Sequence, residues 1–382
     1  MLVRLQKVFV NEPKLDGNER KYLNECIDSG WISFEGPFVK KFEGGIAKLT
    51  NRKYGISVSN GSVALDTAVI ALEIGQDDEV IIPTFTIISC VAPIVRAGAK
   101  PVLVDADPFT WNMNVEDIEA KITKKTKAIM VVHIYGLPVQ MDKIIELADK
   151  YNLYIIEDAA EMHGQTYKGK PCGSFGDIST FSFYPNKHIT CGEGGMVVTN
   201  DEKLAERCKM IRNLFFQNGK RYVHEELGYN FRMTNLQAAV GCAQLERLHQ
   251  TIEKKRHIGK LYNELLKDVD GIQLPVESTM YAENIYWVYG IVLNDSIKVD
   301  ADLIMNKLDK EGISTRGFFW CMHEQPVFKK MHLFIGESYP NAERLARKGF
   351  YLPSGVTLTD EQQKYVVDKL KKVLAEVRVS GI

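Results

Sequence analysis

The distribution of hydrophobic positions predicts an alternation of strands and helices in the first half of the chain. Short apolar runs, typical of buried strands, alternate with longer stretches in which apolar residues recur at helical spacing. The runs predicted as strands are residues 79–82, 101–104, 128–133, 153–156, 180–184 and 196–198. The stretches predicted as helices are residues 64–72, 87–97, 115–122, 141–151 and 203–212. This alternation indicates an α/β fold whose mostly parallel sheet is covered on both faces.

Further elements are predicted on either side of this alternation. Helices are expected at residues 16–29, with Asp16 as the possible N-cap, and at residues 38–49. A long helix over residues 244–266 is expected to lead into a second domain. That domain contains predicted strands at residues 286–293 and 314–319 and predicted helices at residues 301–310 and 360–377. We therefore expect a large domain over residues 1–245 and a smaller C-terminal α+β domain over residues 246–382.

Composition narrows the class of protein. Over 382 residues the net charge is -1, which argues against a nucleic-acid partner, because such proteins need a basic surface. The sequence contains no run of 18 apolar residues, so no membrane span is expected. Residues 1–7 lack the apolar stretch of a secretory signal. The seven cysteines are scattered, without a Cys-x-x-Cys pair. We therefore expect reduced thiols, a cytoplasmic location and no metal site.

A polar turn before the helix at residues 64–72 is a candidate anion site. The turn reads Ser57-Val58-Ser59-Asn60-Gly61-Ser62. Backbone N–H groups at a helix N-terminus favour an anion, and Gly61 and Ser62 would supply them. The hydroxyl of Ser182, five residues before Lys187, could contribute. A plain helix cap is the alternative interpretation.

Two carboxylates follow the strand at residues 153–156. The carboxyl end of a strand is where α/β sheets place ligands. A carboxylate at this position can pair with a protonated pyridine nitrogen, which keeps the ring able to accept electrons, and Asp158 suits this role. A helix N-cap is the alternative for Asp158. Glu161 could face the same site or only solvate a helix turn.

Lys187 is the candidate nucleophile. It follows an aromatic strand and precedes a glycine pair, in Ser182-Phe183-Tyr184-Pro185-Asn186-Lys187. Burial disfavours the ammonium form, so that a buried lysine can condense with an aldehyde. A solvated loop lysine is the alternative for this residue taken alone. Together with the phosphate turn and Asp158, it predicts a pyridoxal 5′-phosphate (PLP) site.

These segments resemble the DegT/DnrJ/EryC1/StrS aminotransferases, which are PLP enzymes of fold type I. The resemblance runs from about Glu12 to the C-terminal helix. It rests on residues 59–65, 83–86, 157–160, 176–183, 186–195 and 228–233. Within the family, the segments around Trp31, Lys187 and Gly228 are most similar to the enzymes that make GDP-perosamine. Those members convert a GDP-linked 4-keto-6-deoxy sugar into its 4-amino sugar, with L-glutamate as amino donor.

The resemblance implies a role for each matching residue. Lys187 would form a Schiff base with the cofactor and act as general acid and base in the 1,3-proton shift. Asp158 would pair with the pyridine nitrogen, and Glu161 would lie near the phenolic oxygen of the ring. Asn230 matches an asparagine that reaches the phosphate from the neighbouring subunit, so a homodimer with shared active sites is expected. The residues that would hold the phosphate within one chain are Gly61, Ser62 and Ser182.

Two departures from the family pattern leave the substrate open. Ile87 stands where an aromatic or bulky residue usually stacks on the ring, so the ring contact would be aliphatic. The segment from Arg316 to His323 lacks the prolines that usually shape the substrate loop. Another keto sugar or a small keto phosphate is therefore an alternative substrate. The candidate substrate-binding residues are Trp31, His188, Arg316 and His323.

Other functions are less consistent with the sequence. PLP-dependent sugar 3-dehydratases of this fold carry histidine at the position that Lys187 occupies here. The lysine therefore favours transamination over dehydration. A non-catalytic regulator would tolerate the loss of Lys187 or Asp158, and both are present. A nicotinamide dehydrogenase is excluded because no Gly-x-Gly-x-x-Gly motif follows the first strand.

Several conspicuous residues have structural interpretations. His133 is expected to be a core histidine with satisfied hydrogen bonds, and His163 could line the pocket. Tyr286 and Trp287 are expected to pack in the interior of the second domain. Lys220 and Arg221 are expected to be solvated, although the loop over residues 213–224 could reach a nucleotide diphosphate.

Overall fold

A seven-stranded sheet dominates the computed structural model, which describes residues 7–217 and 222–379. Its strands lie in the order β1-β9-β8-β5-β4-β2-β3. Within this sheet only β9 runs antiparallel to its neighbours. The predicted α/β class with a mostly parallel sheet is therefore confirmed. The strands are β1 (Tyr54–Val58), β2 (Glu79–Pro83), β3 (Lys100–Val104), β4 (Thr126–Val132), β5 (Tyr154–Asp158), β8 (Ile178–Ser182) and β9 (Gly195–Thr199).

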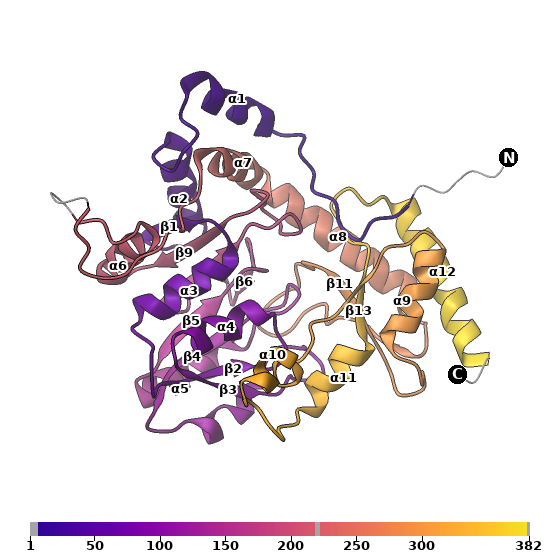
Figure 1. The fold of residues 1–382 in the computed structure, drawn as a ribbon. Coiled ribbons are helices and arrows are strands. Elements are labelled where there is room, and N and C mark those ends of the chain that lie inside the picture. Colours follow the sequence, from indigo (N-terminus) through magenta and orange to yellow (C-terminus); the bar gives the residue numbers. More distant parts are fainter. Residues whose placement is uncertain (1–6, 218–221, 380–382) are drawn as a thin grey trace.

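Helices cover both faces of this sheet (Figure 1). One face carries α3 (Gly61–Ala71), α4 (Ile88–Arg96) and α6 (Glu202–Arg212). The other carries α2 (Pro37–Leu49), α5 (Met141–Tyr151) and α7 (Asn235–Glu246). In β4, Met130 is buried in the hydrophobic core on the side of α3, α4 and α6. Its neighbour Ile129 is buried in the core on the side of α2, α5 and α7. Because both faces of the strand are buried, residues 128–132 are continuously apolar and do not alternate.

A second, antiparallel sheet lies in the C-terminal part of the chain, with strands in the order β10-β11-β13-β12. Helix α8 (Leu248–Leu266) packs against α12 (Asp360–Val379), beside α9 (Ala301–Lys310). The backbone of Val8 is hydrogen-bonded to residues 312 and 314, on this side of the molecule. The domain boundary between residues 245 and 246 stays a prediction. The strands are β10 (Ile272–Gln273), β11 (Tyr289–Leu293), β12 (Arg316–Gly317) and β13 (Gly349–Leu352).

Three predicted helices differ from the structure. Helix α1 (Glu19–Ser29) has Asn18 at its N-cap, so the prediction of Asp16 was wrong. The Asp16 carboxylate pairs instead with Lys14 and Arg247. The single helix predicted over residues 244–266 is two helices, α7 and α8, because the chain leaves helical geometry at Arg247. Residues 115–122 contain two short 3-10 helices, η1 (Val115–Asp117) and η2 (Glu119–Lys121).

Some elements gave too weak a pattern to be predicted. Strand β1 contains Ser57, whose N–H and hydroxyl both donate to Glu43, so a polar residue is satisfied inside a buried strand. Helix α11 (Pro340–Lys348) and strand β13 were also missed. The strand predicted over residues 314–319 is reduced to β12. The remaining short elements are β6 (Thr166–Tyr167), β7 (Lys170–Pro171), η3 (Met322–Glu324) and α10 (Pro326–Lys330).

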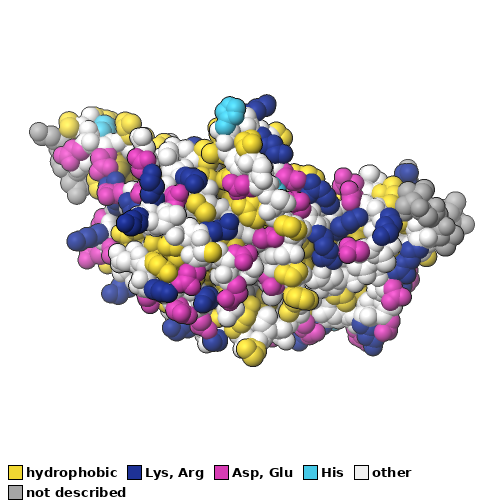
Figure 2. Space-filling model, turned by 90° about the horizontal axis from the view of Figure 1, so that it is seen from below, with side chains coloured by type: hydrophobic (Ala, Val, Ile, Leu, Met, Phe, Trp, Pro, Cys, Tyr) yellow, Lys and Arg dark blue, Asp and Glu magenta, His cyan; other side chains and the backbone are white. Residues whose placement is uncertain are grey.

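The surface is mixed in charge on the face shown in Figure 2. Lysine and arginine side chains are interspersed there with aspartate and glutamate side chains, and neither sign covers a continuous area. Within residues 7–217 and 222–379, no helix combines the length and the apolar character needed to cross a membrane. All seven cysteines are buried and unpaired.

Candidate active site

A cavity of about 760 Å³ lies at the carboxyl ends of the strands of the large sheet. This is the edge at which parallel sheets bind ligands. Residues that follow strands β1, β2, β4, β5 and β8 all contribute to its wall. The predicted site residues that line it are Gly61, Ser62, Ile87, Asp158, Glu161, Ser182, Lys187 and Arg316.

The N-terminus of α3 forms a polar end of this cavity. Asn60 caps the helix by accepting a hydrogen bond from a backbone N–H of the first turn. A methyl group at Gly61 would lie 2.6 Å from Cβ of Ser182, so only glycine lets the turn approach this strand end so closely. The hydroxyls of Ser62 and Ser89 lie 2.7 Å apart. First-turn N–H groups and serine hydroxyls together form a cradle suited to a phosphate.

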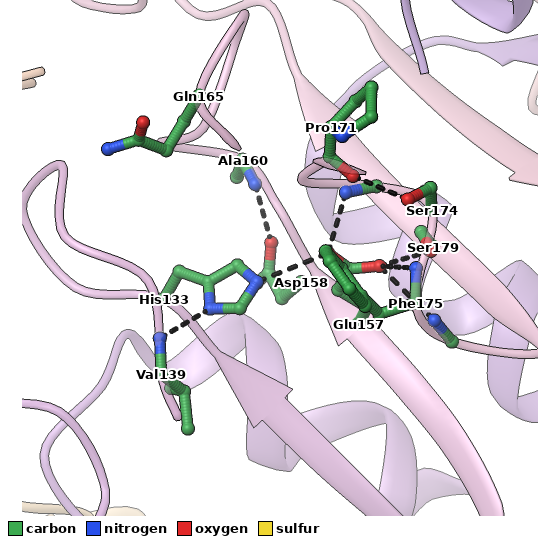
Figure 3. Close-up of polar contacts among 12 residues, drawn as sticks. His133, Val139, Glu157, Asp158, Ala160, Gln165, Pro171, Ser174, Phe175 and Ser179 are labelled. Carbon is green, nitrogen blue, oxygen red and sulfur yellow. Dashed lines mark hydrogen bonds and ion pairs between the residues drawn. The ribbon is translucent and has the colours of Figure 1, made fainter. Parts of the chain in front are cut away.

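Asp158 ends strand β5 with a buried carboxylate. Its Oδ1 accepts a hydrogen bond from the N–H of Ala160 at 3.0 Å (Figure 3), and its Oδ2 accepts one from the thiol of Cys90 at 3.2 Å. Burial raises the pKa of Asp158, and these two hydrogen bonds offset only part of that rise. No helix starts here, which removes the alternative of a helix N-cap.

Lys187 lies in the cavity wall with only 10% of its side chain exposed, and its Nζ is 3.7 Å from Oε1 of Glu161. The other oxygen of Glu161 accepts the N–H of Tyr135 at 2.6 Å. Burial raises the pKa of Glu161 to about 8, although Lys187 opposes the rise. Burial also lowers the pKa of Lys187 below its ordinary value. Burial therefore favours the free amine over the ammonium form, and the interpretation of Lys187 as a solvated loop lysine was wrong.

Trp287 is a cavity residue that sequence reasoning assigned to packing. Its ring centroid lies 3.8 Å from Nζ of Lys187, and its indole N–H donates to the carbonyl of Asn186 at 2.8 Å. Its own carbonyl accepts a hydrogen bond from the buried Lys255 at 2.7 Å. The tryptophan therefore shields the amine on one side. No local pattern signals this, because Trp287 comes from the distant segment before β11.

Glu157 lies next to Asp158 and points to the opposite face of the strand, where it accepts several hydrogen bonds (Figure 3). Nε2 of His133 donates to it at 3.2 Å, while Nδ1 of His133 accepts the N–H of Val139. Burial alone raises the pKa of Glu157, but these donors lower it to about 2. The prediction of a satisfied core histidine at His133 is confirmed. The donors to Glu157 are His133, Gly173, Phe175, Gly176 and Ser179.

Three of the predicted substrate-binding residues lie outside this cavity. His323 is buried, and its ring is hydrogen-bonded to Thr84 and Glu343, so it is not free to contact a substrate. His188 is buried beside a separate cavity of about 20 Å³. Trp31 is half exposed on the surface.

Asn230 is also outside the cavity. It lines a different hollow together with residues 33–35 and Asn213. His163 is buried behind the site, where Nδ1 accepts the N–H of Ile189, and it does not line the cavity. Lys220 and Arg221 lie outside the described residues.

Comparison with known proteins agrees with this geometry. The model of the DegT/DnrJ/EryC1/StrS aminotransferase family matches residues 13–371. The chain belongs to this family. It is a PLP-dependent transaminase, and its architecture is that of PLP fold type I.

Similar proteins cover nearly the whole length of this aminotransferase. GDP-perosamine synthase of Escherichia coli O157:H7 is 43% identical, over 97% of this chain and 100% of that protein. GDP-perosamine synthase of Vibrio cholerae is 44% identical, over 95% of this chain and 98% of that protein. The solved aminotransferase from Psychrobacter cryohalolentis has a TM-score of 0.89 and 32% identity, over 97% of this chain and 99% of that one.

Proposed function

We propose that this aminotransferase moves the amino group of L-glutamate to the keto carbon of a GDP-linked 4-keto-6-deoxy sugar. The pathway would make deoxyamino sugars for surface polysaccharide such as O-antigen or capsule, in the cytoplasm. The observation that carries this proposal is Lys187, buried with Glu161 and Asp158 in a cavity at the carboxyl edge of the sheet. Relatives that are 43% and 44% identical over nearly their full lengths support the choice of substrate class.

The residues of this cavity fit PLP. The cradle at the start of α3 suits the phosphate, and a methyl group at Gly61 would fill the space at Ser182. Asp158 would hold the ring nitrogen, and Glu161 would lie beside the phenolic oxygen. Ile87, 45% exposed at the start of α4, would contact the ring face. The residues that would hold the phosphate are Gly61, Ser62 and Ser182.

When bound, PLP supplies the electrophilic carbon that takes up the amino group and the ring that accepts the electrons released at the substrate carbon. Lys187 would hold and move a proton at Nζ, first as general base toward the substrate carbon and then as general acid. Burial lowers the pKa of Lys187, which favours the free amine that this role needs. Trp287 excludes water from one side of Nζ.

We also propose that the active unit is a homodimer. Asn230 lies outside the cavity of its own chain, in the hollow that it shares with residues 33–35. Asn230 of one chain would then reach the phosphate in the cavity of the other. Ile32, which precedes the hollow residue Ser33 in sequence, is 51% exposed, and Leu227, three residues before Asn230, is 91% exposed; both fit a surface covered by a second chain.

Among the four candidate substrate-binding residues, Arg316 is the one whose position supports this role. It lines the main cavity, as the helix cradle does, and neighbours Tyr351. Its charge would attract the carboxylates of glutamate or the diphosphate of the sugar nucleotide. His188, His323 and Trp31 gain no such support within one chain.

A substrate panel tests the proposal. The PLP-loaded enzyme, with glutamate, is offered GDP-, dTDP- and UDP-linked 4-keto sugars, with small keto phosphates as controls. We expect glutamate to bleach the visible band of the cofactor and the GDP-linked sugar to restore it with formation of a 4-amino sugar. Turnover of only another nucleotide sugar would overturn the choice of GDP. A spectrum unchanged by any amino acid would overturn transamination.

A further inference from the structure

The carboxylate of Asp158 is held by a buried chain of donors that starts in the segment leading into α4. The hydroxyl of Thr86 donates to Sγ of Cys90 at 3.3 Å, and the thiol of Cys90 donates to Oδ2 of Asp158 at 3.2 Å. The exposed fractions of these three residues are 0%, 0% and 5%. On the other side, Ala160 donates its N–H to Oδ1 at 3.0 Å. Both oxygens of the carboxylate are therefore oriented by fixed donors.

We propose that Cys90 is a positioning residue for the cofactor. Its thiol orients the Asp158 carboxylate so that the remaining lone pairs face the ring nitrogen. This inference rests on the proposed contact between Asp158 and that nitrogen. Because α4 begins directly after Ile87, one short segment would set both the contact to the ring face and the orientation of its carboxylate partner.

The chemistry of a thiol suits this role. Burial raises the pKa of Cys90 well above its ordinary value, so the thiol keeps its proton and stays a donor. An S–H group is a weak donor and withdraws less charge from a carboxylate than a hydroxyl does. The carboxylate thus remains a strong acceptor for a protonated ring nitrogen. Thr86, which donates to sulfur, fixes the rotamer of Cys90 so that the S–H points at Asp158.

Affinity for PLP, measured on apoprotein by fluorescence quenching, tests this role apart from turnover. We expect Cys90→Ala to weaken PLP binding by about 2- to 10-fold, the range for one lost hydrogen bond. Cys90→Ser restores a donor and should stay within about 2-fold of the parent. In the loaded enzyme, Cys90→Ala should lower kcat with little change in the KM for glutamate. Cys208→Ala, which removes an equally buried thiol outside the cavity, is the matched control and should change neither.

A double-mutant cycle with Asp158→Asn separates orientation from packing. If Cys90 acts through Asp158, Cys90→Ala should cost no further affinity in the Asp158→Asn background. Equal losses in both backgrounds, or a Cys90→Ser variant as weak as Cys90→Ala, would show that only packing matters and would overturn the inference. Should Cys90→Ala not fold, Cys90→Val fills the space without a donor and replaces it in the cycle.

The cycle also separates this inference from the function on which it rests. If Asp158→Asn itself leaves PLP affinity unchanged, the proposed contact of Asp158 with the ring nitrogen fails, and the role of Cys90 fails with it. If Asp158→Asn weakens binding but Cys90→Ala does not, only the role of Cys90 is lost.

Discussion

The amine of Lys187 and a carboxylate oxygen of Glu161 lie 3.7 Å apart in a buried pair. Burial shifts the pKa of each residue toward its neutral form, upward to about 8 for Glu161 and downward for Lys187. Both groups would therefore change protonation more readily near neutral pH than they do in water. Such shifts are typical of residues that transfer protons.

Replacement of Lys187 should abolish transamination. Lys187→Ala and Lys187→Arg remove the condensing amine, and we expect turnover to fall by about 10²- to 10⁴-fold or more. The measurement is the glutamate-dependent change in the visible spectrum, together with amino-sugar formation. Lys254→Ala, on helix α8, serves as the control and should keep parental rates. Near-normal turnover by Lys187→Ala would contradict the assignment.

Glu161→Gln should change how the stability of the apoprotein depends on pH. The folded-state pKa of Glu161, about 8, lies above the ordinary value of about 4.3. Between these pH values the folded state binds more protons than the unfolded state, so stability falls as pH rises. The variant lacks this loss, which is at most about 1.4 kcal/mol per pH unit. Urea unfolding should therefore favour the variant over the parent more strongly at pH 8 than at pH 5.

A control for this measurement is Glu264→Gln, which changes an exposed glutamate on α8. Its difference from the parent should be the same at both pH values. A Glu161→Gln variant that behaves in the same way would show that Glu161 is ionised throughout.

Glu157→Gln should destabilise the fold. The amide would present N–H groups to donors such as His133 and Ser179, and each hydrogen bond lost to the buried carboxylate costs about 1.5–3 kcal/mol. Because the pKa of Glu157 is lowered to about 2, its stabilisation is present above the ordinary pKa and is lost as pH falls toward 2. Urea unfolding should therefore show the largest difference from the parent above about pH 5. A difference that stays constant down to pH 3 would contradict this.

Gly61→Ala should weaken PLP binding. The added methyl group would lie 2.6 Å from Cβ of Ser182, and overpacking of this kind costs about 1–3 kcal/mol. We expect a loss of affinity of about 5- to 150-fold, measured by titration of apoprotein with PLP. Gly44→Ala is the control, because a methyl group there meets no atom within 4 Å. That change should leave affinity intact and, in helix α2, stabilise the protein by about 0.5–1 kcal/mol.

Arg316→Ala should raise the KM of an anionic substrate. Arg316 lines the cavity, where its side chain contacts the neutral Tyr351. A charge-assisted hydrogen bond contributes about 1.5–3 kcal/mol, which corresponds to a KM increase of about 10- to 150-fold at similar kcat. Steady-state kinetics for glutamate and for the sugar would show which substrate is affected. Arg316→Lys should recover part of the loss, and an unchanged KM for both substrates would exclude the residue.

The sequence predicted this site where local rules apply. Asp158 and Lys187 lie at or after the ends of strands predicted in a parallel sheet, whereas β1, the strand before Gly61, was not predicted. The carboxyl ends of parallel strands converge on one edge, which brings Asp158 and Lys187 together. Their convergence could therefore be foreseen from chain order alone. Chain order could not show whether His323 and His188 contact a substrate, because burial depends on segments far apart in sequence. The same holds for the hydrogen bonds of His323 to Thr84 and Glu343.

The sequence by itself thus determined the α/β fold, the family and the strand-end residues, because periodicity and motifs are local properties of the chain. Tertiary structure alone decided that Trp287 covers Lys187 and that Cys90 donates to Asp158. It also decided the shifted pKa values of Lys187 and Glu161. Those properties arise from burial and from contacts between segments far apart in sequence, which no local pattern encodes.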